Sequence, residues 1–173
     1  MKKRLSFLGA ITLLGTSTTS LVACNNIPQY NEDELQQLKQ ENQICTNCKE
    51  IKEKLEWIAP QEKPFNTVDN KYYYVVWGGD KNDDWKIIKF NNNEKIKRWH
   101  PKTLDVQNNI KLCLTNYAEI PIDIDLSIDA STINLWKSDN GTYFKAVYRW
   151  NGGEENLPDL VVNNDGNVKV NGE

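Results

Sequence analysis

The sequence holds a single histidine, one methionine, three arginines and no run of 18 consecutive apolar residues. The lack of a long apolar run predicts that no helix spans a membrane permanently, because a spanning helix needs about 20 such residues. The formal net charge is −3, whereas most nucleic-acid-binding domains are basic, so we expect no nucleic-acid partner. The 173 residues, 39% of them hydrophobic, suffice for one modest domain with appendages.

Residues 1–24 have the three parts of an export signal. Basic residues at positions 2–4 come first, the apolar run Leu5–Leu14 follows, and a stretch of small and polar residues ends at Ser20. Ten helical residues span about 15 Å, which is about half of a ~30 Å hydrocarbon layer. The segment therefore predicts export followed by cleavage.

Leu21-Val22-Ala23-Cys24 has the residue order of a lipobox. The Cys24 thiol would accept a diacylglyceryl group, and the small Ala23 side chain would allow a signal peptidase to cut before Cys24. Over residues 1–26 the chain resembles the exported lipoproteins of wall-less, low-GC bacteria (mollicutes). The resemblance implies removal of residues 1–23 and anchoring to the outer face of the plasma membrane. The alternative is an ordinary signal peptide that ends in a chance cysteine.

Anchoring of this kind would depend on the lipid. Two acyl chains give stable attachment, whereas one gives only marginal attachment. Removing residues 1–23 would take away three basic residues and no acidic residue, so the formal charge would fall from −3 to −6. We expect such a chain as a whole to be repelled by anionic headgroups.

The rest of the chain predicts an α+β fold, with an N-terminal amphipathic helix and then a mainly antiparallel β domain built as a sandwich or barrel. We expect a lipidated tether over 24–30, the helix over 31–59, a linker over 60–70 and the β-rich domain over 71–173. An Asn cap with acidic residues after it favours a helix start at Asn31, and Pro60 favours its end. Short runs rich in β-branched and aromatic residues predict strands; these are Tyr72–Trp77, Trp85–Phe90, Ile110–Leu114, Ile120–Ile128, Ile133–Lys137, Thr142–Trp150 and Asp159–Val162.

Within the expected helix, apolar residues recur at spacings of four, three, four and three over residues 44–58. They are Ile44, Cys48, Ile51, Leu55 and Ile58. The seam covers only about two heptads, which is too short to predict a coiled coil. It would either pack against the chain's own domain or join copies of the chain in an oligomer, and a solvent-exposed spacer is a third alternative.

Cys45 and Cys48 form a CxxC motif. An oxidising exterior favours a disulfide within the pair or between chains. Zinc would need four ligands, and only Cys113 and His100 remain, so we expect no metal and no other cofactor. A redox centre needs the pair at the start of a helix, whereas this pair is expected inside one. A purely structural pair is a further alternative.

Tryptophans beside Asn and Asp side chains are typical of sugar recognition, although packing in a core explains tryptophans equally well. The residues that would form such a site are Trp77, Asp80, Asn82, Asp84, Trp85 and Trp150. Residues 80–84 also resemble the start of a calcium loop, but Trp85 replaces the required glycine and Asn91 replaces the final glutamate. We expect no calcium there.

Two charged segments complete the pattern. Asp123, Asp125 and Asp129 alternate with apolar residues, which predicts a strand with an acidic solvent-facing stripe. Residues 86–102 are basic in an acidic chain, and they form either a solvated face or a site for polyanions or lipid headgroups. The lone His100 has no recognisable nucleophile to complete a catalytic triad.

We therefore expect a lipid-anchored surface protein that is not an enzyme and that binds an extracellular partner such as another surface protein. A module that binds a glycan or small solute is the alternative. A thiol redox protein that uses Cys45 and Cys48 is the third hypothesis.

Overall fold

The computed structural model describes residues 29–80, 82–117, 121–129 and 131–173. The predicted signal peptide and Cys24 lie outside these ranges, as does most of the tether. Within these ranges, the helices α1 (Glu32–Glu41) and α2 (Lys49–Lys54) precede the strands. The strands are β1 (Leu55–Trp57), β2 (Tyr72–Trp77), β3 (Lys86–Asn91), β4 (Lys102–Gln107), β5 (Ile110–Thr115), β6 (Asp123–Ile128), β7 (Ser131–Leu135), β8 (Phe144–Trp150), β9 (Leu160–Val162) and β10 (Val168–Val170). Four short 3-10 turns are η1 (Pro60–Glu62), η2 (Pro64–Asn66), η3 (Trp136–Ser138) and η4 (Glu154–Asn156).

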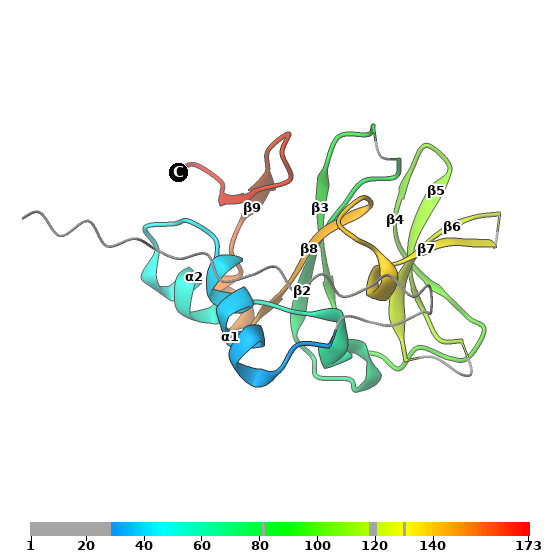
Figure 1. The fold of residues 1–173 in the computed structure, drawn as a ribbon, viewed down its shortest axis with the longest axis horizontal. Coiled ribbons are helices and arrows are strands. Elements are labelled where there is room, and N and C mark those ends of the chain that lie inside the picture. Colours follow the sequence, from blue (N-terminus) through cyan, green and yellow to red (C-terminus); the bar gives the residue numbers. More distant parts are fainter. Residues whose placement is uncertain (1–28, 81, 118–120, 130) are drawn as a thin grey trace, which may run out of the picture.

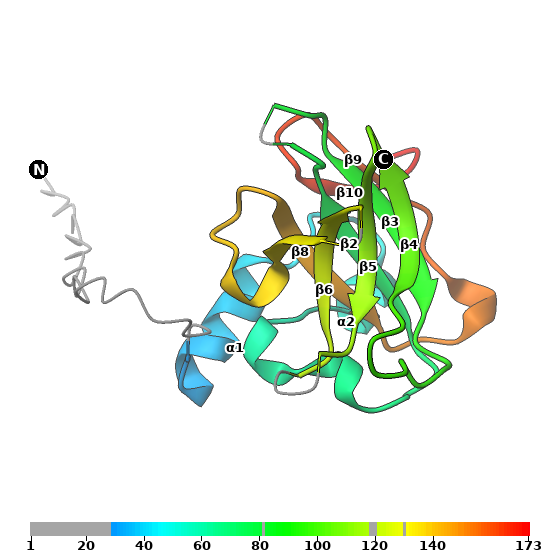
Figure 2. The same cartoon turned by 90° about the vertical axis from the view of Figure 1, so that its right-hand side faces the viewer.

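The strands form two four-stranded antiparallel sheets and one hairpin. The central sheet has the order β1-β8-β2-β3, the outer sheet has the order β4-β5-β6-β7, and β9 pairs with β10. Figure 1 shows the helices and the hairpin on one side of the central sheet and the outer sheet on the other. The turned view looks onto the outer sheet, with the central sheet behind it (Figure 2). The mainly antiparallel β-rich character predicted from the sequence is confirmed.

The first core lies between the two sheets. From β2 it takes Tyr73, Val75 and Trp77, each fully buried. The outer sheet contributes the residues at the alternate positions of β5 and β6, namely Leu112, Leu114, Ile124 and Leu126. Full burial of one such side chain contributes about 1.5–3 kcal/mol, so this face holds the two sheets together.

The second core lies on the opposite face of the central sheet. Tyr74 and Val76 from β2 meet a cover made of α2, the loop before it and the β9–β10 hairpin. β2 is therefore buried on both faces and lies in the middle of the fold.

The single helix expected over residues 31–59 is wrong, because a loop over residues 42–48 separates α1 from α2. At the C-cap of α1, the Asn42 backbone N–H and its side-chain Nδ2 both donate to the carbonyl of Leu38, each at 2.9 Å. Asn, Thr and β-branched residues in the loop have low helix propensity. The last turns of the expected helix form β1 instead, which pairs with β8.

The apolar seam of residues 44–58 is buried within the domain. Ile44, Ile51 and Leu55 belong to the second core and Ile58 to the first, and none of the four is more than 8% exposed. These side chains offer no apolar surface to a second copy of the chain.

One connection also differs from expectation. The segment 60–70, expected as a linker, forms η1 and η2 and places Phe65 in the first core at 3% exposure. Residues 138–141 connect the outer sheet to the central sheet, because β7 pairs with β6 and β8 pairs with β2.

β8 contributes to both cores. Phe144 and Val147 are buried in the first core, whereas Ala146, Tyr148 and Trp150 are buried in the second. The pairing of β8 with β2 shifts its register between Val76 and Trp77.

An ion-pair network fastens α1 to the central sheet. Glu56 of β1 accepts hydrogen bonds from Lys39 Nζ at 2.5 Å and from Arg149 at 2.6 Å. Asn151 Nδ2 donates a third bond to Glu56 at 3.0 Å, and Lys39 also contacts Glu62 at 2.7 Å. Burial alone would raise the pKa of Glu56, but these bonds outweigh it and lower the pKa to about 2.

We predict that Glu56→Gln lowers the free energy of unfolding at pH 7 by about 1–2 kcal/mol, because the charged contacts to α1 and β8 are lost. The pKa is about 2 in the folded state and 4.5 normally, so the contribution of the carboxylate is complete above pH 4.5 and disappears as the pH falls towards 2. Denaturant titrations should show the difference from wild type shrinking over that range. Glu53→Gln, on the exposed face of α2, should change the stability by less than ~0.5 kcal/mol. A pH-independent difference would contradict this assignment.

Candidate functional site

The tryptophans predicted to form a ligand platform do not come together. Trp77 is fully buried in the first core and Trp150 is 1% exposed in the second, on the other side of the central sheet. A platform needs an exposed ring face, so these two residues are core residues. Trp85 is half-buried against the second core.

Three of the expected ligand-binding residues lie in the exposed loop between β2 and β3. Asp80, Asn82 and Asp84 are all exposed, and the Asn82 backbone N–H donates to Asp80 Oδ1 at 3.1 Å. The bond is an ordinary Asx turn that stabilises the loop itself. No group of three or more His, Cys, Asp or Glu side chains suited to a metal ion occurs among the residues that the structure describes.

The CxxC motif lies in the loop between the helices. Cys45 is exposed, Cys48 is half-buried at the N-cap of α2, and both are free thiols. The expectation that the pair sits inside a helix is therefore wrong. Cys113 is 2% exposed, and its sulfur lies 3.7 Å from the hydroxyls of Thr103 and Ser127.

Two of the three carboxylates expected in the acidic stripe are buried, since Asp123 is 4% exposed and Asp125 is fully buried, whereas Asp129 follows β6 and is exposed. Asp123 accepts hydrogen bonds from two backbone N–H groups, while Asp125 Oδ2 accepts from Tyr117 at 3.0 Å and Thr132 at 2.8 Å. Burial raises the pKa of Asp123 to about 6 and raises that of Asp125 as well. β6 lies inside its sheet, between β5 and β7, so the carboxylates do not guard an edge.

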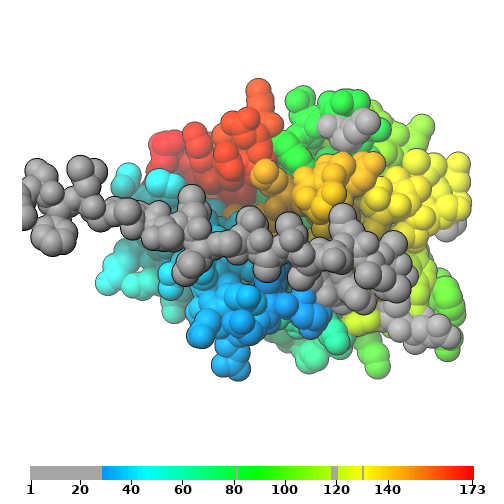
Figure 3. Space-filling view, viewed as in Figure 1, coloured from blue at the N-terminus to red at the C-terminus, as the bar shows by residue number. Residues whose placement is uncertain are grey.

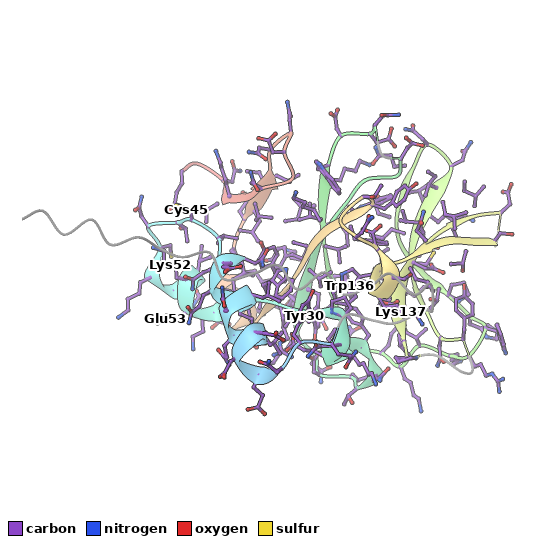
Figure 4. The ribbon with its side chains drawn as sticks, in the orientation of Figure 1. Tyr30, Cys45, Lys52, Glu53, Trp136 and Lys137 are labelled. Atoms are coloured by element: carbon purple, nitrogen blue, oxygen red, sulfur yellow. The ribbon has the colours of Figure 1, made fainter. Side chains whose placement is uncertain are left out.

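A cleft of about 580 Å³ lies where the cover of the central sheet is incomplete, between the α1–α2 loop, β8 and the C-terminal hairpin. We call it the hairpin cleft. It is lined by Glu41, Asn42, Gln43, Ile44, Cys45, Thr46, Asn47, Lys145, Ala146, Tyr148, Gly166, Asn167, Val168, Lys169 and Glu173. The cyan loop and the red C-terminal segment lie next to each other in the space-filling view (Figure 3). Cys45 lies in the loop that lines the cleft, whereas Lys52 and Glu53 are exposed on α2 (Figure 4).

Hydrogen bonds fix the helical wall of the hairpin cleft. Tyr148 on β8 donates its hydroxyl to the carbonyl of Asn42 at 3.1 Å, and Gln43 Nε2 donates to the carbonyl of Lys52 at 2.9 Å. Burial raises the pKa of Tyr148 to about 12, so this donor stays protonated at neutral pH. The Asn47 backbone N–H donates to Glu173 at 3.3 Å and links this wall to the opposite one.

The opposite wall is shaped by the turn between β9 and β10. Asn163 Oδ1 accepts from the backbone N–H groups of Asp165 and Asn167, at 3.1 and 2.8 Å. Gly166 has a φ of +81°, and a Cβ there would lie 2.8 Å from Cγ of Lys145. Glycine thus permits both the turn and the close passage of Lys145 along the cleft.

The chemistry of the hairpin cleft is polar with an apolar floor. Ala146, Val168 and the mostly buried Tyr148 form the apolar part. Two lysines and two glutamates contribute balanced charge, namely Lys145, Lys169, Glu41 and Glu173. The side-chain amides of Asn47 and Asn167 form no hydrogen bond within the described part of the chain. The arrangement can surround a small polar molecule with donors and acceptors.

In comparisons with known proteins, no family model, curated protein or solved structure matches this chain. No helix among the described residues is long and apolar enough to span a membrane. Sequence reasoning missed the hairpin cleft because its walls come from three distant segments. The only local signal was the turn chemistry of residues 163–166, which predicts a turn and not a cleft.

Proposed function

We propose that this protein is anchored by a lipid on Cys24 outside the plasma membrane and that its β domain binds a small polar ligand in the hairpin cleft. Saccharides and small zwitterionic solutes are the ligand classes that the lining fits. The observation that carries the binding proposal is the pairing of a cleft of about 580 Å³ with amides and balanced charges around an apolar floor. Ligand pockets are commonly 300–1,000 Å³ and combine apolar walls with a few polar groups.

The anchoring half of the proposal rests on the lipobox Leu21–Cys24 and the apolar run before it. A diacylglyceryl group supplies two acyl chains, and each buried methylene contributes about 0.8 kcal/mol to membrane attachment. The described domain then needs no membrane-spanning element to stay at the surface.

We predict that the native protein, extracted from membranes, lacks residues 1–23 and carries a diacylglyceryl group on Cys24. Cys24→Ser removes the acceptor thiol, so intact-mass spectrometry should find no lipid and an uncleaved N-terminus. Cys45→Ser removes a thiol without touching the lipobox and should be processed like the wild type. A native protein with residues 1–23 still attached would contradict the anchoring proposal.

We predict that a bulky side chain in the wall of the hairpin cleft abolishes ligand binding. Asn167→Trp places an indole in the cleft, while Asn164→Trp adds the same ring to the same hairpin outside it. In a calorimetric screen of saccharides and zwitterionic solutes, a ligand should bind the wild type and Asn164→Trp equally and bind Asn167→Trp at least about tenfold more weakly, a difference of about 1.4 kcal/mol.

A second measurement uses the thiol in the cleft wall. In the wild type, a bound ligand should slow the alkylation of the exposed Cys45 by iodoacetamide. In Asn167→Trp, the same ligand should leave the rate of alkylation of Cys45 unchanged. Equal binding by the two tryptophan variants, or no slowing of alkylation by any member of the panel, would exclude the cleft as the ligand site.

A further inference from the structure

A basic segment connects β3 to β4, and none of its residues lines the hairpin cleft. Lys95, Lys97 and Arg98 are exposed, and none of them forms an ion pair within the described ranges. The neighbouring Lys102 is paired with Glu94 at 2.6 Å. The segment therefore carries three uncompensated positive charges on a chain whose net charge is negative.

Trp99 stands in the middle of these charges and is 61% exposed, more than any other large hydrophobic side chain that the structure describes. Its φ is +62°, a left-handed conformation that bulky residues rarely adopt. Its ring lies 5.5 Å from that of Tyr117, and the guanidinium of Arg98 lies 5.6 Å from its centroid. The indole is thus held outward by its neighbours and is not folded into a core.

The backbone beneath Trp99 is firmly held. The Trp99 backbone N–H donates to the carbonyl of Asn116 at 3.1 Å, and Asn116 Nδ2 donates back to the carbonyl of Ile96 at 2.9 Å. Ile96 is 4% exposed and belongs to the first core. An anchored loop that exposes an indole in a rare conformation is a feature that the packing of the domain does not require.

We propose that Lys95, Lys97, Arg98 and Trp99, which we call the basic–aromatic patch, contact the anionic headgroup layer of the membrane to which the protein is anchored. Trp side chains settle at the membrane–water interface, and Lys and Arg are attracted to anionic lipids. The inference rests on the proposed lipid anchor. It selects the lipid-headgroup alternative for the basic segment 86–102, because this positive charge is local in a chain that is negative as a whole.

The tether makes this contact accessible. The seven residues from Cys24 to the start of α1 reach at most about 25 Å when fully extended, so an anchored domain stays close to the bilayer. Such confinement gives the patch a high effective concentration of headgroups, and weak contacts then suffice. Sulfated polysaccharides would also satisfy the three charges, but only the membrane is held within reach of the patch by the tether.

The test uses the mature lipidated protein reconstituted into vesicles of phosphatidylcholine or of phosphatidylcholine with phosphatidylglycerol, each containing a lipid brominated near the headgroup. Bromine quenches tryptophan fluorescence only at close range. We expect quenching in the anionic vesicles at least twice that in the neutral ones, reduced by 0.5 M NaCl and lost in Trp99→Phe.

The charge control is matched. Lys95→Gln, Lys97→Gln and Arg98→Gln together should reduce quenching to the level of neutral vesicles. Lys49→Gln, Lys52→Gln and Lys54→Gln remove the same charge from exposed positions on α2 and should leave quenching unchanged. Circular dichroism of both triple variants verifies that they fold.

Three outcomes overturn the proposal. Equal quenching in both vesicle types, or equal effects of the two triple variants, shows that the patch does not meet the membrane. Binding to a heparin column that depends on the patch, without quenching, assigns it to a polysaccharide instead. A protein that does not float with vesicles of either type lacks the anchor, which refutes the proposed function as well.

Discussion

β2 and β8 lie side by side at the centre of the molecule, and each must bury apolar side chains on both of its faces. One face of β2 presents Tyr73, Val75 and Trp77, and the other presents Tyr74 and Val76. A sheet of this kind is stable only between two covers. The outer sheet supplies the first cover, and α2 with the preceding loop and the C-terminal hairpin supplies the second.

The hairpin cleft exists because the second cover closes over the central sheet less completely than the first. A four-stranded sheet fills its side with interlocking apolar residues, whereas a loop and a two-stranded hairpin meet over β8 without closing the space between them. The short Ala146 side chain on β8 leaves room at the floor. The proposed binding site is therefore a consequence of how the second face of the sheet is covered. The basic–aromatic patch belongs to a different segment of the chain, between β3 and β4.

Seven strands could be predicted from short runs rich in β-branched and aromatic residues, most clearly β2, whose predicted and observed bounds coincide. β4 was missed because Lys102–Gln107 is largely polar, and β10 because it has only three residues. β1 was missed because the spacing of Ile51, Leu55 and Ile58 fits one face of a helix, whereas the chain leaves α2 as a strand that buries Leu55 in the second core and then Ile58 in the first. Local periodicity shows which residues are buried but not which partner buries them.

The candidate site could not be predicted, for a related reason. Asn42 and Tyr148 meet across the cleft although they are 106 positions apart, and no local pattern records that contact. The tryptophans, by contrast, favoured a shared ligand platform that does not exist, because Trp77 is buried in the first core and Trp150 in the second. Asp123 and Asp125 were predicted to face solvent but are buried. Their alternation with apolar residues indicates a strand but not whether that strand lies at the edge of its sheet.

The two-sided burial of the central sheet is tested most directly by amide hydrogen exchange on the native protein, resolved by residue. We expect amides of β2 and β8, such as those of Val75 and Val147, to exchange most slowly and only on global unfolding, while those of the edge strand β7 exchange through local opening. Exchange in β8 as fast as in β7 would show that the second cover does not protect the sheet, and would contradict the architecture from which the hairpin cleft is derived.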